Sequence, residues 1–413
     1  MALFQFIREN ARFLAAGAIL SFLSSFGQTY FIAIFSAEIM STYGLSDGAW
    51  GGLYTVSTTA SALVMLWAGA LTDRFRVGRL IWVVLPALAL TALSMALNPW
   101  TGSLFLIVFC LRLFGQGMTM QLAVTAMARW FTARRGLALS ISALGFAVGQ
   151  AGLPVVVAVL LNVMDWRLVW VGAGVVTLAF LPVLRGLLTK ERTPQSLAKS
   201  ATSTGMGGCH WTRGEVLRSP IFWLLLPMLL GPPAWGTALF FQQVHIAEVK
   251  GWPLVDYLAL IPLLTVVGVA TTVASGQFID RFGTAPLARL YLIPFALTFL
   301  IVGVAETLPV AALGLAIFGI GSGIQATLPA AFWSEYFGTA HIGAIKALST
   351  SIMVFGSAIG PGITGALIDL GYNFPDQMLG IAGYFLVASV LAWIAVARAE
   401  TALSATKVDI ESA

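Results

Sequence analysis

Charged residues are scarce in this sequence. Asp, Glu, Lys and Arg make up only 9% of its 413 residues, whereas 59% are hydrophobic and the mean hydropathy is +0.91. A soluble domain has about 25% charged residues, so the composition excludes a water-soluble fold of this length. A lipid bilayer can accommodate the apolar surface. Because each crossing helix needs roughly 20 apolar residues, the chain has room for about twelve crossings.

Cysteines and groups for catalysis are few as well. Cys110 lies in a hydrophobic segment and Cys209 in a polar one, so we expect neither a disulfide nor a metal site from them. The carboxylates near the apolar segments lie at the ends of these segments. No metal triad, nucleophile–base pair or carboxylate pair is recognisable there. The protein is therefore predicted not to be an enzyme and to need no cofactor or metal.

The apolar residues form continuous runs separated by charges and turn residues. The first run follows Arg8 and Arg12 and continues to about Met40. Since a signal-peptide core has only ~7–15 residues, this run is predicted to be a retained transmembrane helix. The sequence predicts an all-α membrane protein with 12 transmembrane helices. Their expected ranges are 14–40, 50–72, 80–98, 102–128, 136–161, 167–188, 220–248, 254–280, 287–305, 309–335, 343–370 and 377–399.

Positive charge is distributed asymmetrically over the connecting segments. If the N-terminus lies in the cytoplasm, 19 of the 22 Lys and Arg residues fall in cytoplasmic segments. Arg167 and Lys250 lie outside, and Arg112 lies within the membrane. Because cytoplasmic loops carry an excess of Lys and Arg, we expect both termini in the cytoplasm and a protein of the cell inner membrane. The net charge of +5 follows from this bias and requires no nucleic acid partner.

The sequence repeats itself after 207 residues. The segment Gly69–Phe75 (GALTDRF) returns as Gly276–Phe282 (GQFIDRF). Residues 189–219 are the only long polar stretch and are rich in Ser, Thr and Gly, as flexible linkers are. These features predict two pseudo-symmetric six-helix halves, 1–188 and 220–413, joined by a cytoplasmic linker.

Three motifs connect the chain with a known family. Residues 69–79 (GALTDRFRVGR) resemble the loop 2–3 signature of the major facilitator superfamily, and 276–282 resemble its degenerate copy. Residues 112–117 (RLFGQG) and 356–365 (GSAIGPGITG) are similar to further motifs of that family. The resemblance implies the major facilitator fold. It also implies a secondary transporter that moves a small molecule across the bilayer by alternating access, and we expect it to work as a monomer.

The resemblance also suggests a role for the loop charges. Asp73 with Arg74 ends the second predicted helix, and Asp280 with Arg281 ends the eighth. A helix N-terminus carries a partial positive charge. The two carboxylates are therefore expected to lie against the cytoplasmic ends of helices 11 and 5 and to act as conformational latches. The alternative is that these charges only anchor the loops at the lipid headgroups.

By the same resemblance, helices 1, 4, 7 and 10 should line the transport pathway, and helix 7 is expected to be interrupted at residues 231–233 (GPP). Polar groups at membrane depth are costly unless they face a cavity or a partner. Arg112, the one basic residue near mid-membrane, is predicted to have a coupling or structural role, with anion binding as the alternative. For each of the other polar residues in these helices, the alternative to substrate binding is a hydrogen bond to a neighbouring helix. The residues predicted to bind substrate are Gln28, Tyr30, Gln116, Trp235, Gln242 and Gln325.

These side chains fit a neutral, planar, hydrogen-bonding substrate. The monocarboxylate transporters of the family have a basic residue in helix 8, and residues 255–280 contain none. Residues 24–31 (SSFGQTYF) resemble a bacterial branch that includes a riboflavin transporter and a copper importer for haem–copper oxidases, but helix 8 lacks the Met or His that copper(I) prefers. The leading prediction is a riboflavin importer. The alternatives are a small organic anion (monocarboxylate-like) transporter, a copper importer and a non-transporting membrane sensor.

Overall fold

The fold is helical throughout the part of the chain that is described. The computed structural model describes residues 2–68, 71–131, 135–188, 204–338 and 341–411, and every regular element in these ranges is a helix. Ten helical segments there are long and apolar enough to cross a membrane. A bent pair, Gln5–Gly27 and Thr29–Tyr43, makes eleven if it counts as one span. The predicted all-α membrane fold is thus confirmed.

One predicted span is missing from these eleven. The helix α4 (Asp47–Ala68) occupies the place of the span expected at 50–72 and has 22 residues, but it is rich in Gly, Ser and Thr. Such residues lower the apolar character of a helix while allowing neighbouring backbones to approach closely. The composition of α4 therefore indicates a helix that is specialised for packing against other helices.

Contacts between residues divide the chain into two compact units. Unit 1 comprises Met1–Leu197 together with Phe240–Val244 and Pro361–Asp369, and unit 2 comprises Ala198–Leu239, His245–Gly360 and Leu370–Ala413. The last residues of helices α12 (Pro220–Phe241) and α19 (Ile342–Asp369) therefore belong to unit 1.

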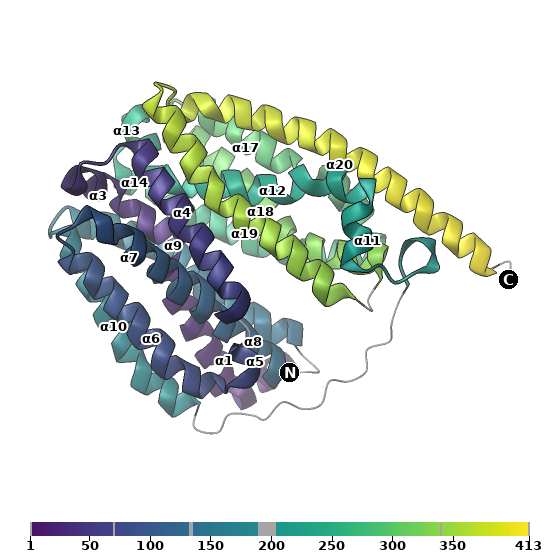
Figure 1. Ribbon diagram of the computed structural model, residues 1–413, viewed down its shortest axis with the longest axis horizontal. Coiled ribbons are helices and arrows are strands. Elements are labelled where there is room, and N and C mark those ends of the chain that lie inside the picture. The colour runs from purple at the N-terminus through teal and green to yellow at the C-terminus, as the bar shows by residue number, and fades with distance from the viewer. Residues whose placement is uncertain (1, 69–70, 132–134, 189–203, 339–340, 412–413) are drawn as a thin grey trace. The chain divides into compact units, whose positions relative to one another are not determined.

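In unit 1, helix α6 packs against α10, α1 against α9, and α4 against α7 (Figure 1). The α-helices of the first 188 residues are α1 (Ala2–Leu23), α2 (Thr29–Ile32), α3 (Ser36–Tyr43), α4, α5 (Leu71–Arg74), α6 (Val77–Leu97), α7 (Leu104–Cys110), α8 (Met120–Trp130), α9 (Arg135–Leu161) and α10 (Trp166–Leu187). Helix α10 begins where Asp165 Oδ1 accepts a hydrogen bond from Arg167 N (2.8 Å), which satisfies a donor that a helix N-terminus leaves open.

In unit 2, helix α15 packs against α18, and α17 packs against both α18 and α20. The α-helices after residue 203 are α11 (Arg213–Arg218), α12, α13 (Gln243–Lys250), α14 (Leu254–Leu258), α15 (Ile261–Phe282), α16 (Ala285–Leu290), α17 (Ile293–Val304), α18 (Leu308–Phe337), α19 and α20 (Phe374–Glu411). Helix α11 starts with a capping box between Thr212 and Glu215. These hydrogen bonds lower the pKa of the Glu215 carboxyl.

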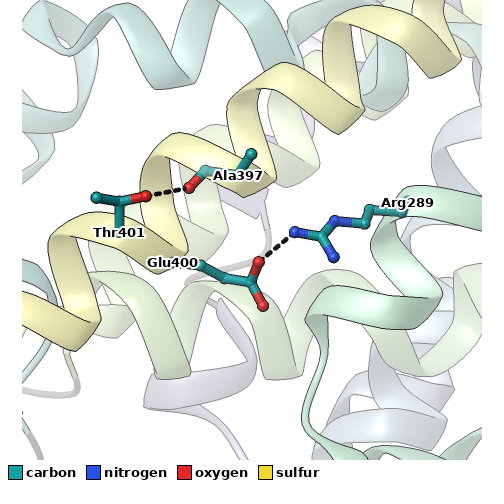
Figure 2. A network of polar contacts seen from close by, with 4 residues as sticks. All are labelled: Arg289, Ala397, Glu400 and Thr401. Atoms are coloured by element: carbon teal, nitrogen blue, oxygen red, sulfur yellow. Dashed lines mark hydrogen bonds and ion pairs between the residues drawn. The ribbon is translucent and has the colours of Figure 1, made fainter.

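Helix α20 is longer than the predicted span 377–399. Its 38 residues extend over roughly 57 Å at 1.5 Å per residue, whereas a bilayer core is about 30 Å thick. The polar end of α20 is attached to α16, because Arg289 forms an ion pair with Glu400 (Figure 2). The Arg289 guanidinium also lies 5.2 Å from the ring centre of Trp393. These contacts hold α20 against α16 at the end of the predicted span.

Candidate functional site

The first membrane helix is broken in its middle. After α1 the backbone forms the short 3-10 helix η1 (Ser24–Gly27), and Gln28 is extended with φ −84° and ψ 152°. Helix α2 and a second short 3-10 helix, η2 (Ala33–Phe35), follow before α3 begins at Ser36. Breaks of this kind free backbone groups from helical hydrogen bonds, and transporters use such breaks at their binding sites.

A widened helix lies against this break. The fourth span contains the π-helix η4 (Leu111–Thr119), and π-helical turns are frequent at functional sites. Gly27 of η1 lies directly against η4, since a Cβ atom at Gly27 would come within 2.6 Å of Gly115 Cα and 2.8 Å of Gln116 N. Only a glycine lets the two backbones approach so closely.

Arg112 projects from η4 toward the break. Its side chain is buried, with 2% exposure, and Arg112 Nη1 donates hydrogen bonds to Gly27 O (3.1 Å) and Thr29 Oγ1 (3.3 Å). Within the described part of the chain, Arg112 Nε is buried without a hydrogen-bond partner and no carboxylate forms an ion pair with the guanidinium. The break is therefore built around a positive charge that no acidic side chain described in the structure neutralises.

Tyr54 of α4 completes this cluster. The Arg112 Cζ atom lies 5.3 Å from the centre of the Tyr54 ring, a cation–π distance. The Tyr54 hydroxyl is 2.6 Å from Thr29 Oγ1, and its side chain is fully buried. Tyr54 and Thr29 thus surround the guanidinium with neutral polar groups. Neither residue was among those predicted to bind substrate. The break after α1 that brings them together leaves no simple sequence signal.

Three of the predicted binding residues lie at the break or beside it. Gln28 is the extended residue itself, and Gln116 is half-buried in η4. Tyr30 is buried and its hydroxyl donates to Ser25 Oγ (2.8 Å), while its ring lies edge-on to Phe146 and Phe240. The structure therefore assembles these three around the first helix break.

The seventh span is interrupted at a different point from the one expected. Helix α12 continues through Pro232 and Pro233, and the interruption falls at Gln242, between α12 and α13. The Tyr384 hydroxyl donates a hydrogen bond to Pro227 O (2.8 Å), in the turn before these prolines. The expectation of a break at residues 231–233 was therefore wrong.

The residues at this interruption contact other segments of unit 1. Gln242 Nε2 donates to Thr364 Oγ1 (3.2 Å), and Gln243 Nε2 donates to Tyr30 O (3.1 Å). Gln242 was predicted to bind substrate, whereas Gln243, which contacts α2 just after the first helix break, was not. Adjacent residues of a helix point in different directions, and only the packing decides which of them reaches the site.

The other predicted residues lie elsewhere. Trp235 and Gln325 belong to unit 2, where the Trp235 ring lies edge-on to Tyr384 at 5.8 Å. Trp235 Nε1 is buried and has no partner among the residues described.

The predicted latch residues Asp280 and Arg281 are exposed at the end of α15. The side chains of Asp73 and Arg74 lie outside the described part of the structure, so their predicted role remains an expectation.

Comparison with known proteins places this chain in a family. The Major Facilitator Superfamily matches residues 17–361 of the chain. The solved structure of the nucleoside transporter NupG is similar, with a TM-score of 0.72 and 14% identity over 93% of this chain and 98% of that one. A bacterial homologue of the human lysosomal transporter Spinster, inward-facing and unoccupied, gives a TM-score of 0.67 and 16% identity over 95% and 98%. The chain belongs to the Major Facilitator Superfamily: it is a secondary transporter and not an enzyme.

Two curated relatives have the same name. Monocarboxylate transporter 13 from Bos taurus is 27% identical over 314 residues, which is 72% of this chain and 69% of that protein. The protein of that name from Rattus norvegicus is 26% identical over 329 residues, which is 74% of this chain and 71% of that protein.

Proposed function

We propose that this transporter carries a small organic anion of the monocarboxylate kind, and that Arg112 binds its carboxylate. The observation that carries this proposal is the buried Arg112 guanidinium, which has hydrogen bonds only from Nη1 and no acidic partner among the described residues. The edge formed by Nε and Nη2 makes no hydrogen bond to those residues. A carboxylate can bind two parallel donors along such an edge.

The cost of a buried charge supports this role. Arg remains protonated in proteins, so burial cannot neutralise it, and an ionised group in a membrane interior is costly unless a partner compensates it. The carbonyl of Gly27, the hydroxyl of Thr29 and the ring of Tyr54 solvate the guanidinium, but these groups are neutral. An anionic substrate would supply the missing negative charge at the broken helix.

The likeness to monocarboxylate transporter 13 points in the same direction. It favours the anion over the neutral heterocycle that the Gln and Trp side chains predicted, since both of these relatives are named as monocarboxylate transporters. The monocarboxylate transporters of the family have a basic residue in helix 8, which is α15 in this structure. In this proposal another residue replaces it. Helix α15 has no Lys or Arg before Arg281 at its end, and Arg112 of the fourth span provides the cation instead.

An uptake assay tests the proposed function directly. The purified protein is reconstituted into liposomes and supplied with radiolabelled lactate or riboflavin, with protein-free liposomes as the control. We expect saturable lactate uptake that pyruvate and acetate inhibit and that riboflavin does not change. Saturable riboflavin uptake without lactate uptake would contradict the proposal and favour the neutral substrate.

The orientation in the membrane is a second part of the proposal. From the 19 positive residues assigned to one side, we expect residues 189–219 to be cytoplasmic. In a background with Cys110→Ala and Cys209→Ser, Ser200→Cys should not react with a membrane-impermeant thiol reagent in intact cells. The control Val163→Cys, at a position that is 74% exposed in a predicted outside loop, should react. Labelling of Ser200→Cys in intact cells would overturn the orientation.

A further inference from the structure

The side chain of Gln243 is buried with one of its two polar ends unused. Gln243 begins helix α13, directly after the interruption at Gln242, and its side chain is only 1% exposed. Gln243 Nε2 donates a hydrogen bond to Tyr30 O (3.1 Å). Because a backbone carbonyl only accepts hydrogen bonds, the NH₂ group has to face Tyr30, and Oε1 has to point away from it. Gln243 Oε1 is buried and accepts no hydrogen bond from the residues described.

The hydroxyl groups at the first helix break are already engaged. The hydroxyls of Thr29 and Tyr54 are hydrogen-bonded to each other, and the Tyr30 hydroxyl donates to Ser25 Oγ. Buried polar groups in native proteins nearly always have a partner, and an acceptor left without one is costly. A hydrogen-bond donor on a bound molecule would supply the partner that Gln243 Oε1 lacks.

Gln243 and Arg112 contact the first membrane helix at adjacent residues. Arg112 Nη1 donates to Thr29 Oγ1. Gln243 Nε2 donates to the carbonyl of the next residue, Tyr30. Consecutive Cα atoms are about 3.8 Å apart, so the two side chains are anchored within one residue of each other.

A second set of contacts within unit 1 joins the same two side chains. The ring centre of Tyr54 lies 5.3 Å from Arg112 Cζ and 4.8 Å from the ring centre of Phe241. Phe241 precedes Gln243 by two residues. The unused edge of the Arg112 guanidinium and the unused oxygen of Gln243 therefore belong to one cluster of side chains, which offers donors at one place and an acceptor at another.

We propose that Gln243 Oε1 accepts a hydrogen bond from a hydroxyl group of the substrate, and that the transporter thereby selects hydroxy acids among the monocarboxylates. The inference rests on the proposed function, in which Arg112 holds the carboxylate. A hydroxy acid complements both unused groups, because its carboxylate accepts hydrogen bonds and its hydroxyl donates one. An unsubstituted acid leaves Oε1 without a partner, and a keto acid brings a second acceptor. Sites that bond a substrate hydroxyl discriminate against analogues that lack it.

Four acids tested on the parent protein give the first measurement. In liposomes, unlabelled lactate, β-hydroxypropionate, propionate and pyruvate compete with labelled lactate for uptake. We expect the better hydroxy acid to bind about 10- to 100-fold more tightly than propionate, because the latter leaves a buried acceptor unsatisfied. Pyruvate should bind no more tightly than propionate. Equal affinities for propionate and both hydroxy acids would overturn the inference and leave the proposed function intact, whereas a failure of all four acids to bind would overturn both.

The variant Gln243→Leu separates contact with the substrate from a purely structural role. It should lower the affinity for the hydroxy acid to that for propionate while the affinity for propionate stays the same. The matched control is Thr364→Val, which removes the partner of Gln242 at the same interruption and should preserve the ratio of the two affinities. An equal loss of affinity for all four acids in Gln243→Leu would show that Gln243 only positions the helices, and would overturn the inference. If this variant does not fold, the ratio measured on the parent protein still decides.

Discussion

Replacing Arg112 with lysine is expected to weaken the apparent affinity for a monocarboxylate by about 10- to 100-fold while the protein still inserts and folds. Lysine keeps the positive charge but lacks the planar fork that binds a carboxylate through two donors. A hydrogen bond to a charged group contributes about 1.5–3 kcal/mol, which corresponds to roughly 10- to 150-fold in affinity. The apparent affinity is measured from the concentration dependence of uptake in liposomes, with thermal unfolding in detergent as the control for folding.

Trp235→Ala is the matched control for this experiment. The Trp235 ring contacts Tyr384, and an indole has no charge to offer a carboxylate, so under the anion proposal its loss should change the affinity little. The opposite pattern would contradict the anion proposal. If Arg112→Lys lowers only the turnover and Trp235→Ala weakens the affinity, the substrate is a flat, neutral molecule and Arg112 has the coupling or structural role.

Gly27→Ala should destabilise the protein strongly. A Cβ atom at this position would collide with three backbone groups of η4, those of Leu111, Gly115 and Gln116, and backbone atoms cannot move aside as side chains do. Overpacking of this kind typically costs about 1–3 kcal/mol and occasionally more, and here the upper end is expected. The unfolding temperature in detergent should fall by several degrees.

Gly152→Ala is the matched control, because no heavy atom lies within 4 Å of a Cβ atom added there. Gly152 lies inside the continuous helix α9, where alanine is favoured over glycine by about 1 kcal/mol. The control variant should therefore be as stable as the parent or slightly more stable. Equal unfolding temperatures for Gly27→Ala and Gly152→Ala would show that the first helix break and η4 are not packed as the structure has them.

Much of the fold follows from the composition and from local patterns. Long apolar runs have to form helices in a bilayer, because a helix satisfies its own backbone hydrogen bonds. The loop pattern of residues 69–79 is specific enough to indicate the family, which the comparison with the Major Facilitator Superfamily confirms. The sequence also singled out Arg112, since a basic residue in the middle of an apolar segment is rare and costly.

What the sequence determined by itself is therefore the class of protein, the approximate position of its membrane helices and the presence of one arginine within an apolar segment. Only the tertiary structure decided where helices break and which residues meet. The break at Gln28 and the hydrogen bond from Arg112 to Gly27 join segments 85 residues apart, and the hydrogen bond from Gln243 to Tyr30 joins segments 213 apart. The physical reason is that helical periodicity is a local property, whereas close backbone contact between two helices depends on glycines in both of them.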